Sequence, residues 1–220
     1  MTPRTRTLFV CGVAAATAAM SAAVYERLPA TVAVHWNVQG QADGYGPRIV
    51  AAALMPLLIL VLPWLFTLGR QILPRTDHIE RSQGAIDTAV ATLSLVLAVV
   101  HAMILGIAIG YPLPVHKVAI GCIGLALAAI GNVLGKTRSN HLIGIRTPWT
   151  MASETVWDKT NRLGGKVLVV EGLACLLAVP FLAAGATAPV AMLAGLCLTV
   201  LWLCWYSYTL FKREQPATTV

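Results

Sequence analysis

The sequence predicts an all-α fold, a polytopic membrane helix bundle with six transmembrane helices and both termini in the cytoplasm. Composition is the first observation, because 57% of the 220 residues are hydrophobic and only 11% are charged, whereas soluble domains carry about 25% charged residues. The second is a mean hydropathy of +0.74, concentrated in six apolar runs long enough to cross a hydrocarbon core of about 30 Å. No soluble domain of useful size is expected between them.

The six apolar runs have the length of helices. A helix crosses a bilayer in about 20 residues, whereas a barrel strand needs only about 10 alternating residues. Helices also satisfy every backbone hydrogen bond without water. The five cysteines all fall inside the runs, so we interpret them as small apolar side chains rather than disulfide or metal ligands. The predicted spans are 7–24, 49–68, 85–110, 118–134, 167–185 and 189–211.

Basic residues orient these spans. Of the sixteen Lys and Arg residues, only Arg27, Arg48 and Lys117 fall on the side opposite to the N-terminus. Basic residues gather in the cytoplasmic segments of membrane proteins, which predicts that both termini are cytoplasmic. The net charge of +7 is then explained by topology and by membrane lipid as a partner. We expect no direct binding of nucleic acid.

The chain is expected to divide into two halves. Residues 1–84 hold two spans and an ordered outer segment, and residues 85–220 hold four spans and a cytoplasmic loop at 135–166, here called the signature loop. We interpret the first span as an uncleaved anchor, although Ser21-Ala22-Ala23 after an apolar run also suits a signal peptide. The charged segment 69–84 is expected to be a solvated connector.

The outer segment between the first two spans is expected to be a compact cap. Residues 31–36 alternate and are β-branched, which predicts a short extended piece. Asp43-Gly44 and Gly46-Pro47 predict turns.

Three polar residues of the cap invite a metal site. His35, Asn37 and Asp43 offer imidazole and oxygen ligands, but they include one histidine and one carboxylate. We therefore favour a hydrogen-bonded turn, with Trp36 and Tyr45 at the membrane interface, and expect no metal and no cofactor.

Two ionisable residues fall within predicted spans. His101 and Glu171 are functional candidates, because a charge inside a membrane is costly. A neutral imidazole can also be satisfied by a hydroxyl on a neighbouring helix, which is the interpretation we favour for His101. Glu171 is expected to form a salt bridge at the inner interface or to face a polar cleft. A small-solute or ion-coupled transporter is the alternative function that these residues leave open.

The signature loop is the longest polar interval of the C-terminal half. Pro148 disfavours helix at the residue before it, and Thr150 is expected to cap a helix over 151–163 that Gly164-Gly165 ends. Trp149 and Trp157 are predicted to dip into the membrane interface. The basic residues expected to meet lipid phosphates are Arg138, Arg146, Lys159 and Arg162.

Catalysis is not predicted for this loop. His141, Ser153 and Glu154 lie near one another in sequence, but their spacing fits no nucleophile with a base and no pair of acids. We expect no enzyme.

Two groups of residues carry a resemblance to a known family. In the C-terminal half they are Gly131-Asn132, Asn140, the run Gly144-Ile145-Arg146-Thr147-Pro148-Trp149-Thr150, Trp157 and Gly164. There the chain resembles the SdpI-like membrane proteins, named for immunity to a sporulation-delaying peptide toxin. The outer residues Leu28-Pro29, His35-Trp36-Asn37, Gly40 and Asp43-Gly44 resemble a small domain of unknown function that often forms the N-terminal half of such proteins.

The resemblance implies an immunity and signalling protein of the bacterial plasma membrane, which gives resistance to an extracellular peptide toxin. It also implies a relay in which the toxin-bound protein captures a cytosolic repressor and releases its own operon. The candidate binding residues are Asn132, Asn140, Arg146, Thr147, Pro148, Trp149, Thr150 and Trp157 inside, and His35, Trp36, Asn37 and Asp43 outside. The alternative for the inner set is a loop that only staples the fourth and fifth spans together at the membrane interface.

Overall fold

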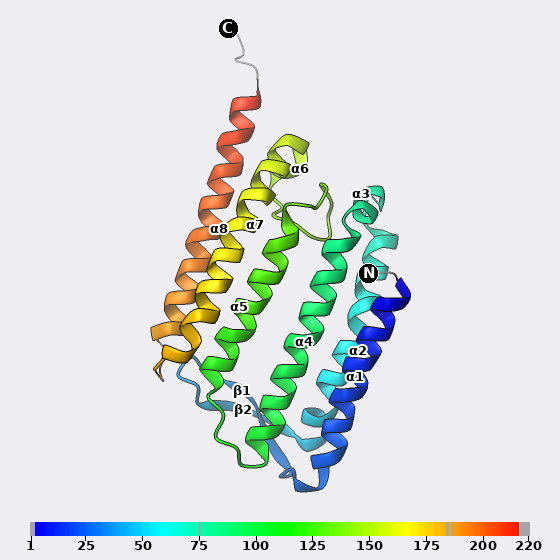
Figure 1. Cartoon of the computed structure of the whole chain (residues 1–220), viewed down its shortest axis with the longest axis vertical. Helices are drawn as coiled ribbons and strands as arrows, with labels where there is room; N and C mark the ends of the chain where they lie inside the picture. The colour runs from blue at the N-terminus through cyan, green and yellow to red at the C-terminus, as the bar shows by residue number, and fades with distance from the viewer. Residues whose placement is uncertain (1–2, 75, 184, 186, 216–220) are drawn as a thin grey trace.

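Six long helices form the protein in the computed structural model, which describes residues 3–74, 76–183, 185 and 187–215 (Figure 1). All six are long and apolar enough to cross a membrane, so the predicted helical membrane bundle is confirmed. Which face is cytoplasmic stays a prediction. The long helices are α1 (Pro3–Val24), α2 (Arg48–Ile72), α4 (Gln83–Ala108), α5 (Val115–Leu134), α7 (Glu154–Ala178) and α8 (Thr187–Glu214).

Short elements lie at the two ends of the bundle. One end carries the hairpin of β1 (Thr31–Trp36) and β2 (Ala42–Pro47), and the other carries α3 (Thr76–Arg81) and α6 (Pro148–Ala152) (Figure 1). Two single 3-10 turns, η1 (Tyr25–Arg27) and η2 (Val179–Phe181), complete the chain. We call these the hairpin end and the loop end.

The helices pack in a row. Helix α1 contacts α2 and α4, α4 contacts α5, α5 contacts α7, and α7 contacts α8. At the hairpin end, Leu28 and Val32 are buried against α2 and α4. At the loop end, Ile79 of α3 and Ile143 of the signature loop are buried against α1, α2, α4 and α5. Both ends are therefore anchored to the bundle by apolar side chains.

The contact between α5 and α7 is a contact between backbones. A Cβ added to Gly131 would lie 2.7 Å from the Gly165 carbonyl oxygen, and one added to Gly172 would lie 2.5 Å from the Gly124 carbonyl oxygen. Small residues let membrane helices approach this closely, where van der Waals packing replaces the hydrophobic effect.

Gly164 and Gly165 do not end a helix, so that prediction was wrong. Helix α7 runs without a break from Glu154 to Ala178. Gly165 is needed for packing, because a Cβ there would lie 2.6 Å from the Gly131 backbone oxygen, whereas one on Gly164 would meet the end of the Ile145 side chain at 2.2 Å. A single helix therefore joins the signature loop to the hairpin end.

The hairpin turns at a different place from the one predicted. The extended piece at β1 is confirmed, but Asp43-Gly44 and Gly46-Pro47 lie within β2. The turn lies between the strands, where Asn37 Oδ1 accepts hydrogen bonds of 3.0 Å from the backbone N–H groups of Gln39 and Gln41, and Gly40 supplies a φ of 78°. The Asn37 side chain stabilises this turn, whereas the prediction relied on the Gly and Pro pairs that follow it in the sequence.

Candidate functional site

The signature loop is folded around the side chain of Trp157. This indole is fully buried, and its Nε1–H donates to the Thr137 carbonyl oxygen at 3.0 Å. Gly144 adopts a φ of 139°, and a Cβ there would lie 2.3 Å from Trp157 Cη2. Only glycine fits that conformation and that contact. Trp157 thus stabilises the signature loop. The prediction that its side chain dips into the membrane interface was wrong.

Asn140 shapes the first half of the loop. It is fully buried, and its Oδ1 accepts hydrogen bonds from the N–H groups of Leu142 and Ile143 at 2.7 and 2.9 Å. Its Nδ2 donates to the carbonyl oxygens of Arg138 and Ile143 at 2.6 and 3.2 Å. One side chain therefore satisfies the backbone groups that a buried loop leaves open.

Two threonines shape the second half, in roles that differ from the prediction. Thr147, not Thr150, is the N-cap of α6, and Thr150 completes a capping box with it. Pro148 then occupies the first helical position, where a missing N–H has no consequence. Ser153 caps α7 by accepting from the Val156 N–H. The predicted single helix is thus two helices that meet at Ser153.

Three contacts hold helix α8 against the signature loop and the start of α7. Thr147 Oγ1 lies 3.1 Å from Ser207 Oγ, Trp149 packs edge-on against Tyr208 with ring centroids 5.1 Å apart, and Ser153 Oγ donates to Glu214 Oε2 at 2.6 Å. The run of residues 144–150 therefore contacts α8, the sixth span. The staple interpretation concerns the fourth and fifth spans and stays a prediction beside the docking role.

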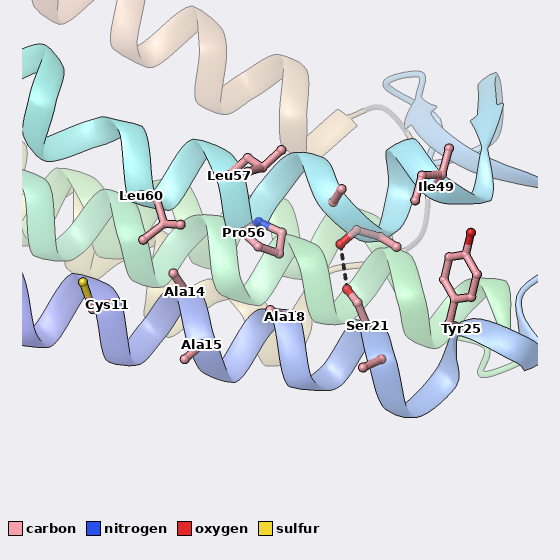
Figure 2. Close-up of a pocket in the computed structure, with 13 residues that line it drawn as sticks. Cys11, Ala14, Ala15, Ala18, Ser21, Tyr25, Ile49, Pro56, Leu57 and Leu60 are labelled. Atoms are coloured by element: carbon pink, nitrogen blue, oxygen red, sulfur yellow. Dashed lines mark hydrogen bonds between the residues drawn. The ribbon is translucent and has the colours of Figure 1, made fainter.

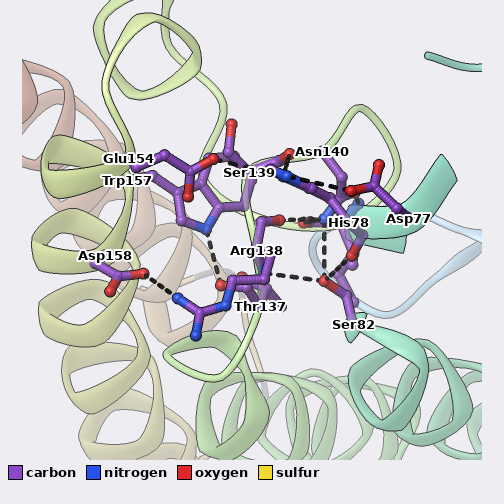
Figure 3. Close-up of polar contacts among 11 residues, drawn as sticks. Asp77, His78, Ser82, Thr137, Arg138, Ser139, Asn140, Glu154, Trp157 and Asp158 are labelled. Atoms are coloured by element: carbon purple, nitrogen blue, oxygen red, sulfur yellow. Dashed lines mark hydrogen bonds and ion pairs between the residues drawn. The ribbon is translucent and has the colours of Figure 1, made fainter. Parts of the chain in front are cut away.

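Segment 69–84 is more than a solvated connector, so that prediction was wrong. In Figure 3, His78 points toward the signature loop, where its Nδ1 lies 2.9 Å from the Ser139 oxygen and 3.5 Å from Glu154 Oε1. Ser82 Oγ accepts from the Arg138 N–H at 2.9 Å. Ile79 is buried in the core and holds α3 where these contacts with the signature loop form. Residue spacing alone gives no sign that two loops 60 residues apart meet.

A partner could reach only the exposed residues of the inner set. Arg146, Pro148 and Asn132 are exposed and Trp149 is partly exposed, whereas Asn140, Thr147, Thr150 and Trp157 are buried. Arg146 Nη1 donates to the His141 carbonyl oxygen. Arg138 lies 3.7 Å from Asp158, so its charge is shared with a carboxylate of α7. Arg146 is the exposed cation at the centre of the signature run.

The outer set lies at the opposite end of the bundle. His35 Nδ1 lies 2.5 Å from Asp43 Oδ1, and these side chains are 71% and 45% exposed. Asn37 holds the turn, while Trp36 packs on the core beneath the hairpin. Among the residues that the structure describes, no group of three metal ligands comes together. The two predicted sets are therefore two separate surfaces.

The two intramembrane candidates bond to different helices. His101 is fully buried, with its Nε2 2.8 Å from Ser21 Oγ of α1. Ser21 in turn donates to the Ala52 oxygen at 2.7 Å, across the apolar groove of about 560 Å³ between α1 and α2 (Figure 2). Glu171 accepts from Thr199 of α8 and lines a small pocket whose other residues are apolar. Within the described part of the chain it forms no ion pair, so neither alternative predicted for Glu171 was right. A hydroxyl partner for His101 was predicted, and the pairing is confirmed.

The ion pair between Arg6 and Asp87 was not predicted from the sequence. Arg6 Nη1 lies 2.8 Å from Asp87 Oδ1, and Gln83 Nε2 donates to the same oxygen at 2.9 Å. Asp87 is only 3% exposed. A carboxylate two residues inside an apolar run, together with an arginine at the start of another run at the same membrane level, was the available signal.

The signature loop and the hairpin both lie in regions that match known protein families. The SdpI/YfhL protein family matches residues 136–207, which run from the signature loop through α7 into α8. A domain of unknown function, DUF1648, matches residues 12–60, which include the hairpin. The chain is also 29% identical over 154 residues to the immunity protein SdpI of Bacillus subtilis, covering 68% of this chain and 69% of that protein.

The match to the SdpI/YfhL family is confined to residues 136–207, and the relative extends the similarity over 68% of the chain. The predicted resemblance is therefore confirmed. The SdpI-matching region contains nearly the whole signature loop, together with α7 and most of α8, which are the elements that Trp157, Thr147 and Trp149 hold together. No solved structure matches the chain.

Asn140→Ala is predicted to loosen the signature loop. The change leaves two buried N–H groups without an acceptor, at a cost of about 1–3 kcal/mol each. Hydrogen exchange at residues 137–146, measured on the purified protein in detergent, should accelerate. Asn132→Ala is the matched control, because Asn132 is exposed, and its loop amides should exchange as in the unchanged protein. Equally slow hydrogen exchange of the loop amides in both variants would contradict the role assigned to Asn140.

Proposed function

We propose that the protein is a multi-pass immunity protein of the bacterial plasma membrane that gives resistance to an extracellular peptide toxin. The observation that carries this proposal is the similarity to a curated immunity protein across two thirds of both chains. The matching regions include both ends of the bundle. The same proposal places the hairpin end outside and the loop end in the cytoplasm, in line with the distribution of basic residues.

The hairpin supports a toxin-facing role. Its exposed apolar side chains include Val34, Val38 and Tyr45, the last 63% exposed. The strands beneath them are held by Val32, which is buried against α2 and α4. A rigid surface with exposed aromatic side chains is the usual form of a binding site for another polypeptide. The His35–Asp43 pair lies on this surface and adds a polar contact.

The loop end supports a docking role for a cytosolic regulator. Arg146 is exposed there, and arginine is among the residues most often found at the centre of interfaces. Helix α7 connects this end to the hairpin end, where Lys117 Nζ at the start of α5 donates to the Pro180 oxygen at 3.1 Å. A shift imposed outside on α5 and α7 would therefore reach the signature loop through one continuous helix.

Expression in a toxin-sensitive bacterium tests immunity. The full chain is expected to raise the lethal concentration of at least one member of a panel of cationic and amphipathic peptide toxins. The double change Val38→Ala and Tyr45→Ala should weaken protection about tenfold, as the loss of an aromatic anchor does. Val200→Ala with Trp205→Ala is the control, because it removes exposed apolar surface from α8. Unchanged killing across the whole panel would count against immunity, and protection equal in both variants would count against the hairpin.

Arg146→Ala separates docking from protection. The variant should protect as well as the unchanged protein but should no longer induce a reporter fused to the promoter of its own gene when toxin is added. Lys159→Ala, which removes an exposed charge from the same end of the bundle, serves as the control. Normal induction by the Arg146→Ala variant would refute the docking role of this residue.

A further inference from the structure

A groove runs between α5 and α7 where the signature loop joins the membrane spans. Its volume is about 500 Å³, and its floor is made by glycines, including Gly131 and Gly165. The groove exists because the two backbones touch there, so that no side chain fills the space between the flanking residues.

Three cations border the groove at its polar end. Lys136 follows the end of α5, and Arg162 and Lys166 lie one turn apart on α7, so they share a face. All three are exposed, and within the described part of the chain no hydrogen bond or ion pair engages these side chains. The groove lining includes no carboxylate. The nearby Asp158 lies 3.7 Å from Arg138, and Arg162 also lines a neighbouring pocket with Glu154 and Asp158. The carboxylates at this end therefore lie outside the groove that Lys136 and Lys166 border.

The other end of the groove is apolar. Val169 and Val170 continue it along α7 into the span, and Val170 is 67% exposed. Asn132 adds an exposed amide beside the cations. The order along the groove is thus cation, amide and hydrocarbon, which is the order of phosphate, glycerol and acyl chain in a phospholipid.

We infer that this groove binds an anionic phospholipid, with its phosphate between Lys136, Arg162 and Lys166 and an acyl chain along Val169 and Val170. Basic pockets between membrane helices are suited to such headgroups, and the guanidinium of Arg162 can engage a phosphate through two parallel hydrogen bonds. The bound lipid would neutralise the charge between α5 and α7 beside their closest contact. This inference does not depend on the proposed immunity function.

Native mass spectrometry of the full chain tests the inference. The protein is released from micelles that contain equal amounts of phosphatidylglycerol and phosphatidylcholine. The unchanged protein should retain phosphatidylglycerol in preference, and the triple variant Lys136→Gln, Arg162→Gln, Lys166→Gln should bind it at least about tenfold more weakly, since each basic residue near a membrane contributes attraction to anionic lipid. Because these side chains are exposed, helix content measured by circular dichroism should not change.

A second triple variant provides the matched control. Lys159→Gln, Lys212→Gln and Arg213→Gln remove the same charge from the same end of the bundle, and this variant should retain phosphatidylglycerol. Equal retention by the groove variant, or equal retention of phosphatidylcholine by the unchanged protein, would overturn the site. Displacement of the lipid by millimolar inorganic phosphate would also overturn it, because the groove would then recognise free phosphate and not a lipid.

Discussion

The contact between the backbones of α5 and α7 is the constraint on which the rest of the structure depends. Gly124 and Gly131 on one helix meet Gly165 and Gly172 on the other, at separations that no side chain could occupy. In a membrane, where lipid tails are as apolar as leucine, close packing of this kind drives association in place of the hydrophobic effect. It fixes α7 in rotation, and that rotation brings Trp157 under the signature loop and leaves the groove beside Lys136 open.

The sequence was sufficient for the architecture but not for the roles of its glycines and tryptophans. Apolar length predicts six helices because the bilayer sets that length, and the family resemblance locates the signature loop. Gly164-Gly165 suggests a helix end only when lateral contacts are unknown, since a glycine also permits helices to touch. Trp157 resembles an interface anchor in sequence, but its position is decided by contacts with Gly144 and with the Thr137 carbonyl oxygen, which the fold brings to it. Contacts such as His78 with Ser139 depend on tertiary packing and leave no local pattern.

The candidate site is consequently two surfaces at opposite ends of the bundle. Most of the family signature is buried and builds the loop, which explains why a run of seven residues is needed to present a single exposed arginine. The hairpin, held by Asn37 and Val32, presents the exposed apolar and aromatic side chains. The proposed immunity and docking roles use different surfaces, and α7 is one of the long helices that run between the two ends.

Helix α7 is continuous from Glu154 to Ala178, and a distance between two spin labels on it measures that continuity. Labels at Thr155 and Leu177, both exposed, would be introduced after the five cysteines are changed to alanine. Double electron–electron resonance should give one narrow distribution near about 33 Å, the span of 22 helical residues at about 1.5 Å each. A broad distribution, or a clearly shorter distance, would show that the helix breaks at Gly164-Gly165 and would contradict the account.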